Sequence, residues 1–389
     1  MKVTFIGCPF QTSYGAYIRD LGAALTQEVD AQVRWVATKC GCGDPEERYR
    51  RFIVQDCEYF ELPVISDYRS TSPLRRRLRF AVKHVFDDMR AARYESLAKD
   101  KPDVVHFQQT LAAFGSDVVF RWLKRRASAR KVVTVHELDA QQQADPAANR
   151  GYNLAHAVLV HDGLLGRRLV ETGVDAHRVH QICHGVRVDA QAPVPRDQRN
   201  DIVFYAGHKP MSGKGIDILF PAYASLQREL GDGAPRLLVH GHYGNAAPRE
   251  GIELAARHGI GDAVVWLNQI TLEDMHALYD RALLCVLPYS GSFAGLPCAV
   301  AAAHGVAVIG TDVAGIPEHL GEHYACVAVG DGEALQQHMR RLVLDQAQWS
   351  DLSVGVHAHA ARALDWSVVA RRTHGIYATV AGAAGDAGT

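Results

Sequence analysis

The 389-residue chain has no long apolar run, and this absence argues against an integral membrane protein. No segment approaches the ~20 apolar residues that a helix needs to cross a bilayer. The first apolar run, at 3–7, ends at Gly7 and Pro9. A secretory signal needs a longer apolar core and a small-residue cleavage site, so we interpret this run as a buried strand of a cytoplasmic protein.

The chain also lacks an excess of charge of either sign. It has 42 Lys and Arg against 43 Asp and Glu, a formal net charge of -1. This balance argues against a nucleic-acid footprint over the whole protein, so we expect no nucleic-acid partner. With 48% hydrophobic and 22% charged residues, the composition is typical of a globular protein.

Clustered cysteine is missing as well. The eight cysteines are scattered, and Cys40 and Cys42 form a C-x-C without a second pair nearby. This spacing disfavours a zinc site, and we expect no metal. Cys8, Cys285 and Cys298 fall in apolar segments, which predicts buried, reduced thiols.

What the chain does have is an α/β pattern that occurs twice. Val- and Ile-rich runs separated by helical stretches predict parallel sheets covered on both faces. The runs of the first half are 3–7, 31–38, 102–107, 131–137 and 157–161, and those of the second half are 201–207, 236–241, 263–268, 283–289, 306–311 and 325–329.

A Pro-rich, charged segment separates the two halves. We predict an N-terminal domain, a linker, a C-terminal domain, a helix crossing back to the first domain and a flexible tail. Their bounds are 1–189, 190–200, 201–363, 364–380 and 381–389. Two doubly wound, Rossmann-like domains would face each other across a ligand cleft at the carboxyl ends of their strands.

The segment 205-YAGHKPMSGKGIDILF-220 is the first candidate site. A strand ends at Gly207, and Lys214 lies where the next helix opens. Cations in such a loop suit a diphosphate, with Lys214 as a point charge and His208 as a hydrogen-bond donor or a charge. The alternative is a surface loop with a solvated lysine.

The segment 287-LPYSGSFAGLPCAVAAAHGVAVIGTD-312 is the second. Its glycines permit close approach to a ligand, and amides at a helix N-terminus can bind phosphate. Pro297 is well tolerated in the first helical turn. A purely structural turn is the alternative. In the first half, 7-GCPFQTSYGAYIRDLGAAL-25 is another strand–loop–helix, and His136 ends a strand, a position that is more often structural than catalytic.

Together these segments resemble the retaining glycosyltransferases of family 4, which have the GT-B fold. The resemblance covers nearly the whole chain in the family's order. The segments that carry it are SYGAYIRDLGAAL, PDVVHF, VVTVHEL, HAVLVHDGLLGRRLVETGV, QICHGVRVD, YAGHKPMSGKGIDIL, LLVHGHYGN, WLNQITLEDMHALYDRALLCVLPYSGSFAGLP, GTDVAGIPEHL and WSVVARRTHGIY. Within them Asp162 is placed as a helix N-cap.

The resemblance implies transfer from a nucleoside-diphosphate sugar to a small-molecule or glycan acceptor, with retention and without a metal or cofactor. Catalytic roles would fall to His136, His208 and Lys214. The donor would be bound by Gly207, Lys214, Ser292, Phe293, Ala294, Gly295, Leu296 and Pro297, and the acceptor side would include Ser13, Tyr14 and Gly15.

The chain departs from the family's pattern at several positions. His208 stands in place of an arginine, and the two glutamates of the family's E-x7-E fall on Ser292 and Val300. The paired glycines of the first loop are replaced by Thr12 and Ser13. Val300 accepts no hydrogen bond from a ribose hydroxyl, so ribose recognition must be lost or come from elsewhere.

A basic stretch at 72–90 predicts an amphipathic helix that begins at Ser72 and Pro73. It is suited to anionic lipid or a phosphorylated acceptor, but a core-packed helix with a solvated arginine face is favoured. Asp87 and Asp88 argue against deep membrane contact.

The sequence is therefore compatible with three functional hypotheses. The first is a glycosyltransferase with an altered donor site. The second is a noncatalytic GT-B protein that binds a nucleotide or a partner. The third is another reaction on a nucleotide-activated substrate, such as epimerisation or transfer of a non-hexose group.

Overall fold

The structure is a computed structural model. It describes residues 1–6, 13–38, 57–60, 101–109, 116–125, 129–138, 142, 145–189, 193–207, 213–241, 249–268, 270–291, 295–313 and 315–382. The predicted basic helix at 72–90, the C-x-C pair and the loop residues His208, Ser292, Phe293 and Ala294 lie outside these ranges.

The chain forms two compact units. Unit 1 contains Met1–Ile182 and Trp366–Thr389, and unit 2 contains Cys183–Asp365. The first boundary lies a few residues before the predicted linker of 190–200. Ile182 donates its amide to the Val160 carbonyl at 2.8 Å within unit 1, whereas Val186 donates to Leu364 at 2.9 Å within unit 2.

Unit 1 has a parallel seven-stranded sheet of order β3-β2-β1-β4-β5-β6-β7. The strands are β1 Lys2–Ile6, β2 Gln32–Thr38, β3 Cys57–Phe60, β4 Val104–Gln109, β5 Arg130–Val135, β6 Ala157–Val160 and β7 Val179–Gln181. The α-helices are α1 Ser13–Val29, α4 Ser116–Lys124, α6 Gly163–Glu171 and α14 Trp366–Gly382. In the described part of this unit, the 3-10 helices η1 Pro146–Leu154 and η2 Ala176–Arg178 precede β6 and β7.

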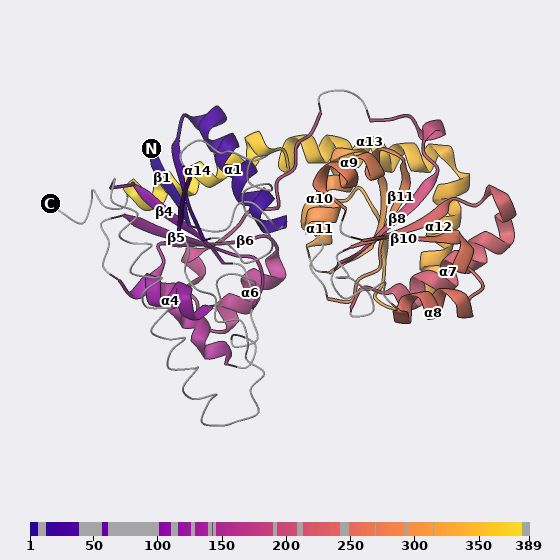
Figure 1. The fold of residues 1–389 in the computed structure, drawn as a ribbon, viewed down its shortest axis with the longest axis horizontal. Helices are drawn as coiled ribbons and strands as arrows, with labels where there is room; N and C mark the ends of the chain where they lie inside the picture. The colour runs from indigo at the N-terminus through magenta and orange to yellow at the C-terminus, as the bar shows by residue number, and fades with distance from the viewer. Residues whose placement is uncertain are drawn as a thin grey trace. The chain divides into compact units, whose positions relative to one another are not determined.

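Helices cover both faces of the unit 1 sheet, as Figure 1 shows, with α1 and α14 on one face and α4 and α6 on the other. Alternation along the strands divides the core accordingly. Phe5 packs with Tyr17 and Tyr377 in one cluster, whereas Ile6 packs with Trp122 in the other. Side chains that alternate between two apolar layers are what a buried parallel sheet requires.

Unit 2 has a parallel six-stranded sheet of order β10-β9-β8-β11-β12-β13. The strands are β8 Asp201–Gly207, β9 Arg236–Gly241, β10 Val264–Asn268, β11 Ala282–Leu287, β12 Ala307–Thr311 and β13 Ala325–Val327. The α-helices are α7 Ile216–Leu230, α8 Arg249–Arg257, α9 Leu272–Asp280, α10 Gly295–Ala303, α11 Ile316–Leu320, α12 Gly332–Leu344 and α13 Gln346–Ala363, and the 3-10 helices are η3 Arg196–Gln198, η4 Gly231–Gly233 and η5 Gly261–Ala263. All six residues of β11 are buried, as its unbroken apolar sequence predicts.

Polar side chains begin several of these helices. Asp162 accepts a hydrogen bond from the Leu165 amide at 2.8 Å, which confirms the predicted N-cap of α6. Thr271 and Asp274 form a reciprocal capping box at the start of α9. Such caps satisfy amides that have no partner inside the helix.

The predicted α/β architecture with two doubly wound, Rossmann-like sheets is confirmed. Among the described residues, no helix combines the length and the apolar character needed to cross a membrane. Cys285 and Cys298 are buried, free thiols, as predicted, whereas Cys8 lies outside the described residues.

Candidate functional site

The strand order of unit 2 has a switch point between β8 and β11. From this pair, β9 and β10 extend the sheet on one side, and β12 and β13 extend it on the other. The segments that follow β8 and β11 therefore leave toward α7 and α10 at neighbouring places on the carboxyl edge. Ligands of open α/β sheets bind at such points. Both sequence-predicted segments of this unit lie there.

The turn into α7 can only be made with glycine. Gly215 is the N-cap of α7 and has φ 72° and ψ 23°. A Cβ at this position would lie 2.0 Å from the carbonyl oxygen of Pro288, in the segment after β11. The left-handed conformation and the close approach both exclude a side chain.

Three hydrogen bonds hold the neighbouring segments. The Ser290 amide donates to the Gly213 carbonyl at 3.1 Å and so joins the two segments directly. The Tyr289 hydroxyl donates to the Tyr205 carbonyl of β8, and Thr311 Oγ1 donates to the Tyr289 carbonyl at 2.6 Å. The backbone on both sides of Lys214 is therefore fixed.

Lys214 itself is buried, with 8% of its surface exposed. Its Nζ lies 3.8 Å from the ring centroid of Tyr289 and 5.5 Å from that of Tyr205. Its Cε comes within 3.6 Å of the place that a Cβ on Gly207 would occupy. Burial lowers the pKa of the Lys214 ammonium to about 7, and the nearby Cys298 opposes this shift.

Helix α10 begins at Gly295 and places Pro297 in its first turn, as predicted. Gly295 and Pro297 are buried and Leu296 is partly buried. Val300, where the family pattern has its second glutamate, is fully buried and packs in the apolar core of unit 2. The described part of α10 therefore offers no carboxylate for a ribose.

Cys298, in the first turn of α10, is a site neighbour that sequence reasoning placed only in the core. Burial raises the pKa of its thiol well above the usual value, Lys214 lowers it, and Glu318 of α11 raises it. Tyr205 and Tyr289 were also missed as partners of Lys214. The only sequence signal for them was their position at the ends of two strands that the fold makes adjacent.

In unit 1, His136 follows β5 and is 4% exposed. Its Nε2 lies 2.9 Å from Gln108 Oε1, and its Nδ1 lies 2.9 Å from His161 Nε2. His161 Nδ1 donates to the Ile182 carbonyl at 2.8 Å. Both ring nitrogens of His136 therefore have protein partners inside unit 1, and its role toward a substrate stays a prediction.

The predicted acceptor-side residues, Ser13, Tyr14 and Gly15, form the first turn of α1. Amides of a first helical turn have no partners within the helix. Across the described ranges, no group of three or more His, Cys, Asp or Glu side chains is arranged to hold a metal ion.

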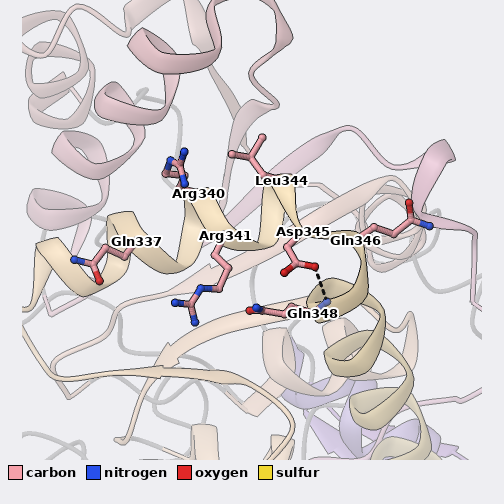
Figure 2. Close-up of a pocket in the computed structure, with 7 residues that line it drawn as sticks. All are labelled: Gln337, Arg340, Arg341, Leu344, Asp345, Gln346 and Gln348. Atoms are coloured by element: carbon pink, nitrogen blue, oxygen red, sulfur yellow. Dashed lines mark hydrogen bonds between the residues drawn. The ribbon is translucent and has the colours of Figure 1, made fainter.

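A cavity of about 830 Å³ lies elsewhere on unit 2, at the turn between α12 and α13 (Figure 2). Its lining residues are Gln337, Arg340, Arg341, Leu344, Asp345, Gln346 and Gln348. Trp349, just beyond them, donates to the carbonyl of Leu283 at the start of β11. The cavity thus lies toward the amino edge of the sheet, away from Lys214, so we do not assign the chemistry to it.

Comparison with known proteins identifies the family. Residues 13–185 match the family described as "Glycosyl transferase 4-like domain", and residues 199–345 match "Glycosyl transferases group 1". The two matches follow one another along the chain and cover most of both units. The chain belongs to the GT-B glycosyltransferases.

Curated relatives of this GT-B glycosyltransferase match it over part of their length. D-inositol 3-phosphate glycosyltransferase of Salinispora tropica is 32% identical over 211 residues, which are 51% of this chain and 43% of that protein. Serotype-specific mannosyltransferase WbdA of Escherichia coli is 27% identical over 150 residues, 38% of this chain and 18% of that protein. The chain thus spans less than half the length of these relatives.

Solved structures share the fold across almost the whole chain. Sucrose-phosphate synthase from Thermosynechococcus elongatus has a TM-score of 0.73 at 20% identity and covers 98% of this chain and 100% of its own. The Anabaena protein HepE in complex with UDP has a TM-score of 0.70 at 14% identity, with coverage of 97% and 100%.

Proposed function

We propose that this GT-B glycosyltransferase moves a sugar from a nucleoside-diphosphate sugar to a small-molecule or glycan acceptor with retention of anomeric configuration. One observation carries the proposal. Lys214 is a buried cation at the switch point of unit 2, between the starts of α7 and α10. A cation and free helix amides suit the diphosphate that leaves when the glycosidic bond breaks.

In this proposal the leaving diphosphate needs neither a metal nor a cofactor. The Lys214 ammonium neutralises part of its charge, and N-terminal amides of α10 donate to its oxygens. The turn at Gly295, Leu296 and Pro297 lines the donor sugar. His136 of unit 1 would bind a substrate hydroxyl through Nε2. To do so, this nitrogen would have to give up its contact with Gln108 Oε1.

The printed names of relatives suggest the first substrates to test. HepE was also solved with UDP-glucose, and the Salinispora relative is named for an inositol 3-phosphate acceptor. A UDP-sugar and a phosphorylated polyol are therefore reasonable members of a donor and acceptor panel.

A second function is favoured by Val300. Because this side chain is fully buried among apolar residues, the contact with ribose that the family makes through a glutamate is absent from α10. A protein that binds a nucleotide or a partner without turnover is the second candidate.

The two candidates are separated by measuring product. The chain is incubated with UDP-, GDP-, ADP- and dTDP-sugars and an acceptor panel, and nucleotide release and product anomer are followed by NMR. We expect one donor to be consumed with retention, and Lys214→Ala to lower the rate about 100-fold or more. Arg257→Ala, which removes an exposed cation of α8, is the matched control. Nucleotide binding without product would support the second candidate.

A further inference from the structure

Lys214 has no carboxylate partner within unit 2. No described Asp or Glu forms an ion pair with it, and no described atom accepts a hydrogen bond from its Nζ. The undescribed segments of unit 2 are 190–192, 208–212, 242–248, 269, 292–294 and 314, and none contains Asp or Glu. A buried cation normally requires a compensating group. The compensation must therefore be of another kind.

Two tyrosine rings supply it. The Nζ of Lys214 lies 3.8 Å from the centroid of the Tyr289 ring, well within the range of a cation–π contact, and 5.5 Å from that of Tyr205. The Tyr289 ring is held by complete burial as well as by the bond from its hydroxyl to the Tyr205 carbonyl. The Tyr205 ring in turn packs at 5.1 Å against His240 of β9.

We propose that Tyr289 and Tyr205 form an aromatic cage that positions the Lys214 ammonium for a nucleoside diphosphate and replaces an acidic counter-ion. Tyr289 is the positioning residue, because its ring is the nearer one and its backbone joins the two segments of the site. The proposal rests on the proposed function for the identity of the ligand, but the cage itself does not.

The groups around the ammonium explain why the cage matters. Tyr205 faces it from β8, Tyr289 from the segment after β11, and Cys298 from α10, with Glu318 of α11 beyond that thiol. Burial makes the charged form costly, and the N-terminus of α7 adds positive potential. The rings stabilise the charged ammonium but, unlike a carboxylate, carry no net negative charge. The positive charge of Lys214 is therefore not cancelled before a diphosphate binds.

The first test titrates Lys214 without any ligand. Unit 2 contains only two lysines, Lys209 and Lys214, so acetylation of each is resolved by mass spectrometry across pH. Tyr289→Phe keeps an aromatic ring face toward the ammonium. Phenylalanine analogues with one, two and three ring fluorines at this position then reduce the negative electrostatic potential of that face with little change of volume. We expect the pH midpoint of Lys214 acetylation in Tyr289→Phe to equal that of the wild type. Across the fluorinated series this midpoint should fall by about one pH unit in total.

The same series placed at Tyr223 is the matched control. Tyr223 is a fully buried tyrosine of α7 whose hydroxyl donates to the Pro235 carbonyl, away from Lys214. Substitution there should change stability and leave the Lys214 midpoint unchanged. A midpoint that does not move across the Tyr289 series, or one that moves as far across the Tyr223 series, would overturn the cage.

The second test adds a nucleotide. Affinity for a diphosphate should fall about tenfold across the fluorine series at pH 8 and hardly at all at pH 6, because only the charged ammonium binds. Damage to folding would instead lower affinity equally at both pH values. If acetylation reports the cage but no nucleoside diphosphate binds, the ligand assignment and the proposed function both fail while the cage stands.

Discussion

At the residue scale, the binding role proposed for Lys214 opposes the effect of this side chain on folding. Its pKa falls from 10.5 in a solvated chain to about 7 in the folded protein because the amine is buried. Between these two values the unfolded chain binds more protons than the folded one. Stability therefore rises with pH across this window, and the full penalty of the buried charge is present below pH 7.

Replacing Lys214 with methionine should expose this conflict. Lys214→Met keeps the length of the side chain and removes the charge, so we expect unit 2 to gain about 1–3 kcal/mol of unfolding free energy at pH 6. The gain should shrink toward pH 10. Urea unfolding at both pH values measures it, with Arg257→Met as the control. A loss of stability at pH 6 would contradict the assigned burial.

Single residues differ in how far the sequence reveals them. Lys214 was predicted because its loop, its spacing from the strand end and the helix start are local features. Its partnership with Tyr205 and Tyr289 depends on β8 and β11 being neighbours, which is a property of the sheet. The packing of Val300 in the core was equally hidden, because a helix position does not reveal which face is covered.

At the scale of elements, the site depends on two segments held against each other. Gly215 places α7 against the carbonyl of Pro288, and Ser290 bonds to Gly213. The helix starts and the ammonium are thus arranged before any ligand arrives. Such preorganisation is what electrostatic stabilisation of a leaving group requires.

Gly215→Ala should break this arrangement. A Cβ would meet the Pro288 carbonyl oxygen at 2.0 Å in a left-handed conformation, so we expect a loss of more than about 2 kcal/mol and loss of nucleotide binding. Gly231→Ala is the control, since Gly231 also has a positive φ of 55° but no atom within 4 Å. Equal effects of the two changes on binding would show that the close contact is unimportant.

The elements themselves were predicted best where apolar runs are continuous. Strands β8 and β9 have the predicted bounds, and α7 begins two residues after Lys214, where the sequence indicates that the helix opens. Strand β3 was missed because Cys57–Phe60 carries Glu58 and lies in a segment without apolar alternation. Strand β7 has only three residues, too few to form a pattern.

At the scale of the whole molecule, the end of the chain completes the unit that contains its beginning. Helix α14 packs against α1, and the hydroxyl oxygen of Tyr377 lies 2.5 Å from Nδ1 of His106 in β4. Burial lowers the pKa of His106 to about 3, so this histidine is neutral at pH 7. The sequence predicted a helix that returns, but not the polar contact beneath it.

Tyr377→Phe tests this organisation. Removing the hydroxyl leaves a buried His106 nitrogen without its partner, and we expect unit 1 to lose about 1–3 kcal/mol. Hydrogen exchange should speed up in β4, α1 and α14, while unit 2 stays unchanged. Tyr223→Phe, which removes a buried hydroxyl of unit 2, should give the reverse pattern. Equal acceleration in both units would contradict separate cores.

The central claim is that unit 2 has a working site for a nucleoside diphosphate at Lys214. Calorimetric titration with UDP, GDP, ADP and dTDP tests it directly on the wild type, Lys214→Ala and the control Arg257→Ala. We predict micromolar binding of one nucleotide that is lost only in Lys214→Ala. Absence of binding to all four, or equal binding by the three proteins, would contradict the account.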